Sequence, residues 1–311
     1  MSVHSFPAQP VQPVPPVQVA APAPRPVPWQ RMIWVTWRQH RGMLAGVAAV
    51  LATVSAFLLI MGLKVHHDYT ALLSCRHACA AANSSFNNTD WTMGNTILIL
   101  MNLAPALLGI FTGPAVFARE LETGTFRYAW TQGIGRLRWT IAKLVLLAAA
   151  IVVLTWAFSQ VFGWFFDPFL GFEGMNVLAA TVFDTRGIDF AAWVLLAFAI
   201  GAFLGMLIRR VIPAMAATLG AYLGVQLLAW LVLRENYPVA INTTNASLFN
   251  KPDSPASPWI LKTWTVGGTS WWRYIPVSRF WPMQLIESGW LLVLAIALAV
   301  ATVRLVRRRA A

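Results

Sequence analysis

Six long apolar stretches, separated by shorter polar segments, dominate the pattern of this chain. They are Gly42–Leu63, Thr96–Phe117, Trp139–Phe166, Phe190–Ile208, Val211–Leu233 and Leu285–Val303. Each is close to the roughly 20 residues that a helix needs to cross about 30 Å of hydrocarbon. Their apolarity is continuous rather than alternating, which favours helices over the strands of a barrel. The pattern therefore predicts an all-α polytopic membrane protein with six transmembrane helices, spread over residues 42–311.

Two different segments precede the first apolar stretch. Residues 1–28 hold nine of the 19 prolines and one charge, Arg25, a composition that favours a disordered tail. In residues 29–41, apolar residues such as Trp29 and Trp37 recur at helical spacing among arginines. This pattern is typical of an amphipathic helix that lies in the membrane interface. A plain cytoplasmic extension of the first span is the alternative.

Composition supports the membrane assignment and orients the chain. Hydrophobic residues make up 58% and charged residues only 11%, whereas a soluble domain is about 25% charged. With the N-terminus inside, 15 of the 23 lysines and arginines but only two of the 11 acids face the cytoplasm. This asymmetry predicts a multi-pass plasma-membrane protein with both termini cytoplasmic. The net charge of +12 thus reflects topology and not nucleic-acid binding.

The two long outer segments carry different signals. Between the first two spans, the loop Lys64–Met93 contains Cys75, Cys79 and three histidines. We expect a local disulfide between the cysteines because the outer face is oxidising; unpaired thiols and a metal site are the weaker alternatives, and no metal is predicted. The tryptophan-rich segment 234–284 precedes the last span. We expect it to form short re-entrant or surface helices.

The cytoplasmic loop 118–138 is the strongest candidate for chemistry in the polar segments. Glu120 and Glu122 are the only acids on an otherwise basic face, which suggests a specific partner for them. The alternative is a solvated loop whose acids balance nearby arginines. A short helix is expected from Leu121 to Trp130, ended by Gly133 and Gly135.

Few polar residues interrupt the spans. Asn102, Gln160 and Gln226 are the candidates for a substrate path, although a structural role as interhelical hydrogen-bonding groups is the stronger alternative. No acid is expected deep within a span, Asp184 is expected in an outer loop, and Lys143 is expected to snorkel to the inner surface. This argues against an ion-coupled carrier and against an intramembrane hydrolase, since both need buried ionisable groups.

A family resemblance rests on the order of several motifs. The run Arg119-Glu-x-Glu-x-Gly-Thr-Phe126, then Gln132-Gly-x-x-Arg-x-x-Trp-x-x-x-Lys143, resembles the cytoplasmic loop of permease subunits of type-2 ATP-binding-cassette (ABC) exporters. An elbow helix before six spans and Gly113-Pro114 at the end of the second span extend this resemblance. The run 276–284 resembles actinobacterial members of that family. The resemblance implies that loop 118–138 is a coupling helix that docks on an ATPase subunit. The implied contact residues are Glu120, Glu122, Gly124, Thr125 and Arg127.

The resemblance implies a transport subunit rather than an enzyme. None of the four lysines lies in the G-x-x-x-x-G-K-[ST] context of a P-loop, so ATP and magnesium are expected on a separate ATPase subunit and no cofactor in this chain. The implied assembly pairs the chain with a second copy or a sister permease, within membrane lipid. An amphiphilic or hydrophobic substrate, such as a drug, lipid or peptide antibiotic, would move outward. A non-transporting membrane anchor or immunity protein is the alternative.

The charge asymmetry leads to a direct test of topology. Reporter fusions at Asn88 and Thr244 should be found on the outer face, and fusions at Gly133 and Ala311 in the cytoplasm. A reporter at Gly133 that is exposed outside the cell would overturn the predicted orientation.

Overall fold

The computed structural model describes residues 28–75, 79, 84, 86–124, 136–170, 176–237, 240–245 and 258–308. Its longer helices are α1 (Trp29–Ser74), α3 (Thr92–Thr112), α6 (Arg136–Phe166), α8 (Asp189–Ile208), α9 (Val211–Leu228) and α10 (Phe280–Arg308). The helices α4 (Ala118–Thr123) and α7 (Ala180–Phe183) are short. Single π or 3₁₀ turns are η1 (Phe86–Trp91), η2 (Pro114–Val116), η3 (Asp167–Phe169), η5 (Ala229–Leu233), η6 (Arg234–Asn236) and η8 (Val277–Arg279).

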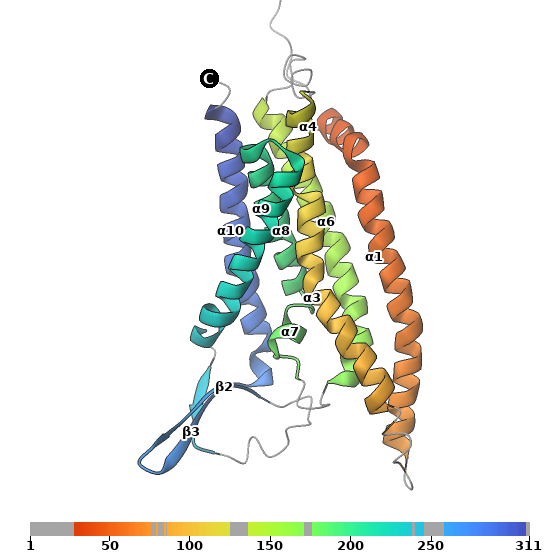
Figure 1. Ribbon diagram of the computed structural model, residues 1–311, viewed down its shortest axis with the longest axis vertical. Coiled ribbons are helices and arrows are strands. Elements are labelled where there is room, and N and C mark those ends of the chain that lie inside the picture. The colour runs from red at the N-terminus through yellow and green to blue at the C-terminus, as the bar shows by residue number, and fades with distance from the viewer. Residues whose placement is uncertain are drawn as a thin grey trace, which may run out of the picture.

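Within the described residues, six helical stretches are long and apolar enough to cross a membrane. They contain the six apolar stretches of the sequence, so the predicted six-helix fold is confirmed. The long helices run side by side along the long axis of the molecule (Figure 1). The start of α1, α4 and the end of α10 lie at one end of the bundle, which we call the α4 end. The strands and α7 lie toward the opposite end.

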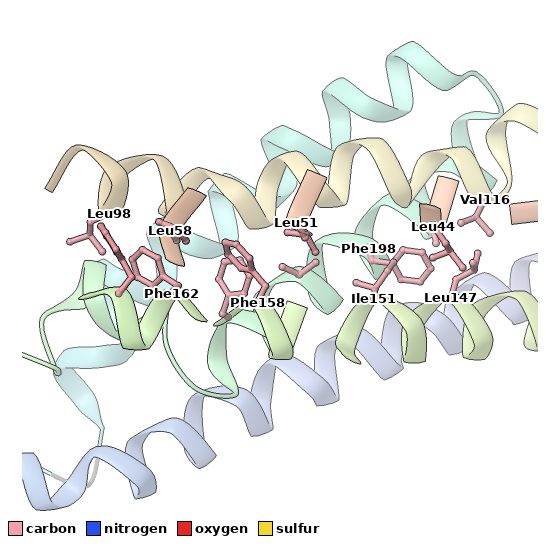
Figure 2. Packing of buried hydrophobic residues seen from close by; sticks show 14 of the residues in the cluster. Leu44, Leu51, Leu58, Leu98, Val116, Leu147, Ile151, Phe158, Phe162 and Phe198 are labelled. Carbon is pink, nitrogen blue, oxygen red and sulfur yellow. The ribbon is translucent and has the colours of Figure 1, made fainter. Parts of the chain in front are cut away.

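Helix α8 forms the centre of the bundle. It is the most buried of the six spans and packs against α3, α6, α9 and α10. A second layer of the core lies between α1, α3 and α6, where Leu51 and Leu58 of α1 face Phe158 and Phe162 of α6 (Figure 2). Because lipid is as apolar as these side chains, close packing rather than exclusion from water holds the helices together.

A close backbone contact joins the end of α3 to α8. A Cβ atom added at Gly201 would lie 2.6 Å from Cδ of Pro114 and 2.8 Å from Cα of Gly113. A Cβ atom added at Gly205 would lie 2.9 Å from the carbonyl oxygen of Pro114. The G-x-x-x-G spacing of Gly201 and Gly205 therefore allows the two backbones to touch. Pro114 starts η2, so α3 ends at this contact and the chain can turn into α4.

Residues 29–41 form the first part of α1 rather than a helix of their own. Helix α1 is continuous over 46 residues, from Trp29 to Ser74. Met32, Thr36 and His40 are buried one turn apart, while Trp34 and Trp37 are exposed. The amphipathic pattern is thus present, but its position in a membrane interface stays a prediction. The proline-rich tail predicted for residues 1–28 lies outside the described residues, except for Pro28.

The prediction of short helices in segment 234–284 is wrong for the described part between η6 and η8, which forms strands. Three strands, β1 (Ile241–Thr243), β2 (Trp259–Val266) and β3 (Thr269–Ile275), form an antiparallel sheet in the order β1-β3-β2. The β2–β3 hairpin projects from the bundle (Figure 1). Gly267 and Gly268, which join β2 to β3, both have positive φ, at 56° and 81°. Two such residues between β-branched and aromatic runs favour a hairpin.

Gly201 and Gly220 each begin a G-x-x-x-G motif. The α3–α8 contact predicts that replacement by a larger residue destabilises the protein at Gly201 but not at Gly220. Gly201→Val should lower the free energy of unfolding by about 1–3 kcal/mol or more, because the new methyl groups would overlap Gly113 and Pro114. Gly220→Val is the matched control, since no atom lies within 4 Å of a Cβ atom added there. Thermal unfolding of the purified protein in detergent measures both. Equal melting temperatures for the two variants would contradict this account of the packing.

Candidate functional site

Helix α4 connects the second and third spans at the α4 end of the bundle. It begins at Ala118, one residue after η2, and ends at Thr123, before Gly124, which adopts the left-handed conformation with φ of 73°. The helix predicted from Leu121 to Trp130 starts earlier, and α4 ends before Gly124, because glycine terminates a helix easily in this conformation; residues 125–130 of the prediction lie outside the described residues. Thr125 and Arg127 lie outside the described residues.

Glu120 of α4 binds a buried lysine of α6. Its carboxylate accepts a hydrogen bond from Nζ of Lys143, and the two form an ion pair. The Lys143 side chain is fully buried, and its ammonium group lies 4.0 Å from the centre of the Trp139 ring. The expectation that Lys143 snorkels to the surface is wrong, since an internal carboxylate and an aromatic face are within its reach.

Glu122 of α4 binds the start of α9. Its carboxylate accepts a hydrogen bond of 3.1 Å from the backbone N–H of Val211, the first residue of α9. This contact is favourable because a helix N-terminus carries unpaired N–H groups and a partial positive charge. Arg209, with φ of 63°, and the extended Arg210 form the two-residue turn that places this N-terminus beside α4.

These contacts define the α4 junction, made of Glu120, Glu122, Trp139, Lys143 and Val211. Phe117, just before α4, supports it by packing against Trp139 with ring centres 5.9 Å apart. A six-residue helix is thus attached by one carboxylate to α6 and by the other to α9. Through these two contacts α4 touches both the third and the fifth span.

The two acids thus have partners within the chain. Glu120 is only partly exposed, at 20% of its side chain, whereas Glu122 is exposed. Only Glu122 therefore keeps substantial surface for contact with another protein. The assignment of Glu120, Glu122 and Gly124 to an ATPase contact stays a prediction.

The three polar residues predicted in a substrate path lie on three different helices. The amide of Asn102 on α3 donates to the carbonyl oxygens of Leu98 and Thr181, at 2.8 and 3.0 Å. Gln160 on α6 is exposed and bonds within its own helix, and Gln226 on α9 is buried. The contacts of Asn102 are those of an interhelical hydrogen-bonding group, the alternative reading of this residue. Their role in a substrate path stays a prediction.

The cysteines of the first long loop are joined to each other. A disulfide links Cys75 and Cys79 just beyond the end of α1. His66, one of the three histidines of that loop, stacks on the Trp164 ring with centres 4.5 Å apart. His77 lies outside the described residues. In the described part of this loop, His66 thus serves the packing of α1 against α6.

A buried ion-pair cluster at the opposite end was not predicted. Arg234, directly after η5, is 1% exposed and donates to the carboxylates of Asp184 and Glu287. Asp189, at the start of α8, is also buried and accepts a hydrogen bond from Ser288. We call Asp184, Asp189, Arg234 and Glu287 the Arg234 cluster. It connects the α7–α8 turn, the end of the fifth span and α10.

The Arg234 cluster corrects two expectations. Asp184 is buried rather than exposed in an outer loop, and burial raises the pKa of its carboxyl to about 6. Glu287 is a buried acid within the predicted last span. Both acids can be buried because the guanidinium of Arg234 stabilises carboxylates that would otherwise be costly to bury. Glu287 lies inside an apolar stretch of the sequence, and this position was the signal from which a buried, functional or paired acid could have been predicted.

The same cluster is the one described group whose acids approach closely enough to share a metal ion. One oxygen each of Asp184, Asp189 and Glu287 lies within 4.8 Å of the others. Arg234 already bridges Asp184 and Glu287. We therefore interpret the group as an ion-pair cluster that holds helices together.

Comparison with known proteins identifies one similarity. A family described as ABC-2 membrane transporter related matches residues 48–234, well over half of the chain. The matched region runs from α1 through η5 to Arg234 and includes the whole α4 junction. Neither a curated protein nor a solved structure matches the chain.

The Glu120–Lys143 pair leads to a test by two variants. Glu120→Gln should lower the free energy of unfolding by about 3–5 kcal/mol, because it leaves a buried ammonium group without its counter-charge. Adding Lys143→Met should restore most of the loss, since a neutral pair has no charge to bury. The measurement is thermal unfolding in detergent. A single variant as stable as wild type would show that Lys143 does not depend on Glu120.

Proposed function

The chain belongs to the ABC-2 membrane transporter related family and is thus a membrane-spanning permease of an ABC transporter; we propose that it is the permease subunit of an exporter driven by a separate ATPase. In this proposal the ATPase subunit docks at the α4 end, from the cytoplasm. The cargo is an amphiphilic or hydrophobic molecule, such as a drug, a lipid or a peptide antibiotic. The family is a transport component of the membrane, and the ATPase activity is assigned to the partner.

The α4 junction is the observation that carries the proposal. Coupling needs an element that a partner can reach and that moves the spans when it is pushed. Helix α4 meets both needs, since Glu122 is exposed while Glu120 and Glu122 connect it to α6 and α9. Closure of an ATPase dimer against α4 would therefore shift two spans together. Such a switch requires several kcal/mol of preference for one state, which ATP-driven closure can supply.

The distribution of charge supports docking at the α4 end. Exposed basic side chains described there come from several elements, among them Arg41 in α1, Arg209 and Arg210 before α9, and Arg304 and Arg307 in α10. Basic residues concentrate on the cytoplasmic side of membrane proteins. An ATPase subunit in the cytoplasm would thus contact a surface that is basic around α4 and that carries the acidic side chain of Glu122.

A pair of permeases is part of the proposal. Gly220 and Gly224 of α9 have no atom within 4 Å of an added Cβ, so a helix of another chain can approach closely at these two positions. We propose that a second copy or a sister permease completes the transport path. The spans are largely apolar apart from the Arg234 cluster, which suits a hydrophobic or amphiphilic cargo better than a small ion.

A non-transporting membrane anchor or immunity protein remains the rival function. Such a protein would keep six spans but would not need an ATPase. The deciding experiment is co-expression of the chain with a candidate ATPase subunit, followed by purification and assay of ATP hydrolysis. We expect a stable complex with vanadate-sensitive activity and no hydrolysis by this chain alone. Hydrolysis by the isolated chain, or no complex with any ATPase, would refute the proposal.

Glu122 is the acid to test for docking, because Glu120 is occupied by Lys143. Glu122→Gln should leave stability nearly unchanged, since the amide oxygen can still accept from Val211. Loss of a charge-assisted contact, at about 1.5–3 kcal/mol, should lower the affinity for the ATPase about tenfold or more. The readout is the yield of co-purified ATPase.

The matched control for this variant is Asp68→Asn at the opposite end. Asp68 is a partly exposed acid near the end of α1 and should not affect docking. Equal yields from Glu122→Gln and wild type would assign Glu122 to the α9 contact alone.

A further inference from the structure

A groove runs along the surface of the bundle between α6 and α10, starting at the α4 end. Its first part has a volume of about 380 Å³ and is lined by apolar side chains of both helices. Leu144 and Val145 of α6 and Ile296 and Ala299 of α10 also line a second hollow of about 260 Å³. The two hollows are therefore parts of one groove. The α4 junction and the Arg234 cluster contribute none of the lining that these hollows share.

The floor of the deeper part is formed by α8. Leu195, Phe198 and Ala199 line it, and small residues on the walls, such as Ala148 and Ala295, keep it open. Because α8 is the central helix, the groove reaches the core of the bundle from the lipid side. Its apolar lining would be costly to expose to water but is well suited to a hydrocarbon chain.

Two arginines lie at the mouth of the groove. Arg304 and Arg307 of α10 line the first hollow together with Val300 and Val303. Both arginines are exposed, and among the described residues neither has an ion-pair partner. They are three positions apart, so their side chains project from the same face of the helix. The groove thus combines a dicationic mouth with an apolar interior.

The length of the groove matches a lipid chain. From Arg307 to Leu292 the helix advances about 22 Å, at about 1.5 Å per residue. One leaflet of hydrocarbon is about 15 Å thick, half of a typical core. A lipid whose phosphate lies at the arginines could therefore place a whole acyl chain against the floor of the groove.

We propose that this groove binds an anionic phospholipid of the leaflet at the α4 end. One acyl chain lies along α6, α8 and α10, and the phosphate and anionic headgroup contact Arg304 and Arg307. Arginine suits this role because its planar guanidinium binds phosphate oxygens in pairs. The site does not depend on the proposed transport function.

Charge disfavours a second copy of the chain as the occupant. In a two-fold symmetric contact through this groove, each copy would bring its own Arg304 and Arg307 to the same interface. Four like charges would then face each other with no described acid between them. A phospholipid supplies the opposite charge that the mouth lacks.

Spin-labelled lipids in detergent-free bilayers provide the test. The purified chain is reconstituted in phosphatidylcholine, and electron paramagnetic resonance measures the immobilised fraction of labelled phosphatidylglycerol and of labelled phosphatidylcholine. We expect the wild type to select phosphatidylglycerol several-fold. Arg304→Gln combined with Arg307→Gln should abolish this selectivity. Arg308→Gln is the matched control, since Arg308 is exposed on the same turn but does not line the groove.

A second variant tests the apolar part without changing charge. Ala299→Phe should fill the groove where its two hollows meet and should reduce the immobilised phosphatidylglycerol at least as far as the arginine variant does. The proposal is overturned if the double arginine variant stays selective, if Arg308→Gln loses selectivity equally, or if Ala299→Phe has no effect. Cross-linking of Ala299→Cys between two copies would assign the groove to a second chain and also overturn it.

Discussion

The contact between the end of α3 and α8 is the constraint on which much of the structure depends. Gly113 and Gly201 bring two backbones together more closely than any side chain would allow. In lipid, where apolar side chains gain little by leaving the solvent, such close packing supplies much of the attraction between helices. The contact places Pro114 against α8 and ends α3 there, and η2 and α4 follow.

Each end of the bundle is then secured by a buried basic residue. Lys143 binds Glu120 at the α4 end, and Arg234 binds Asp184 and Glu287 at the other. Buried charges add little net stability compared with apolar packing, but removal of one partner is costly. They therefore specify which helices meet. The pairs differ in one respect that matters for function, because α4 also presents the exposed Glu122 while the Arg234 cluster is enclosed.

This difference suggests that the two ends of the bundle have different roles. In the proposed function, the α4 end carries the element that a cytoplasmic partner would push, together with basic side chains suited to anionic lipid. The Arg234 cluster joins α10 to the α7–α8 turn and to the end of the fifth span, and it would then serve as a fixed point for motion that starts at α4. Rocking of spans about such a point is a common form of alternating access.

The sequence by itself determined the six spans. They follow from local pattern, since continuous apolarity is visible without knowledge of neighbours. It also contained the signal of the β2–β3 hairpin in Gly267 and Gly268, although tryptophan-rich composition suggested surface helices instead. The tertiary structure alone decided which charges meet. Lys143 reaches Glu120 across 23 positions and Arg234 reaches Glu287 across 53, and pairing over such separations depends on how the helices pack, which no local pattern encodes.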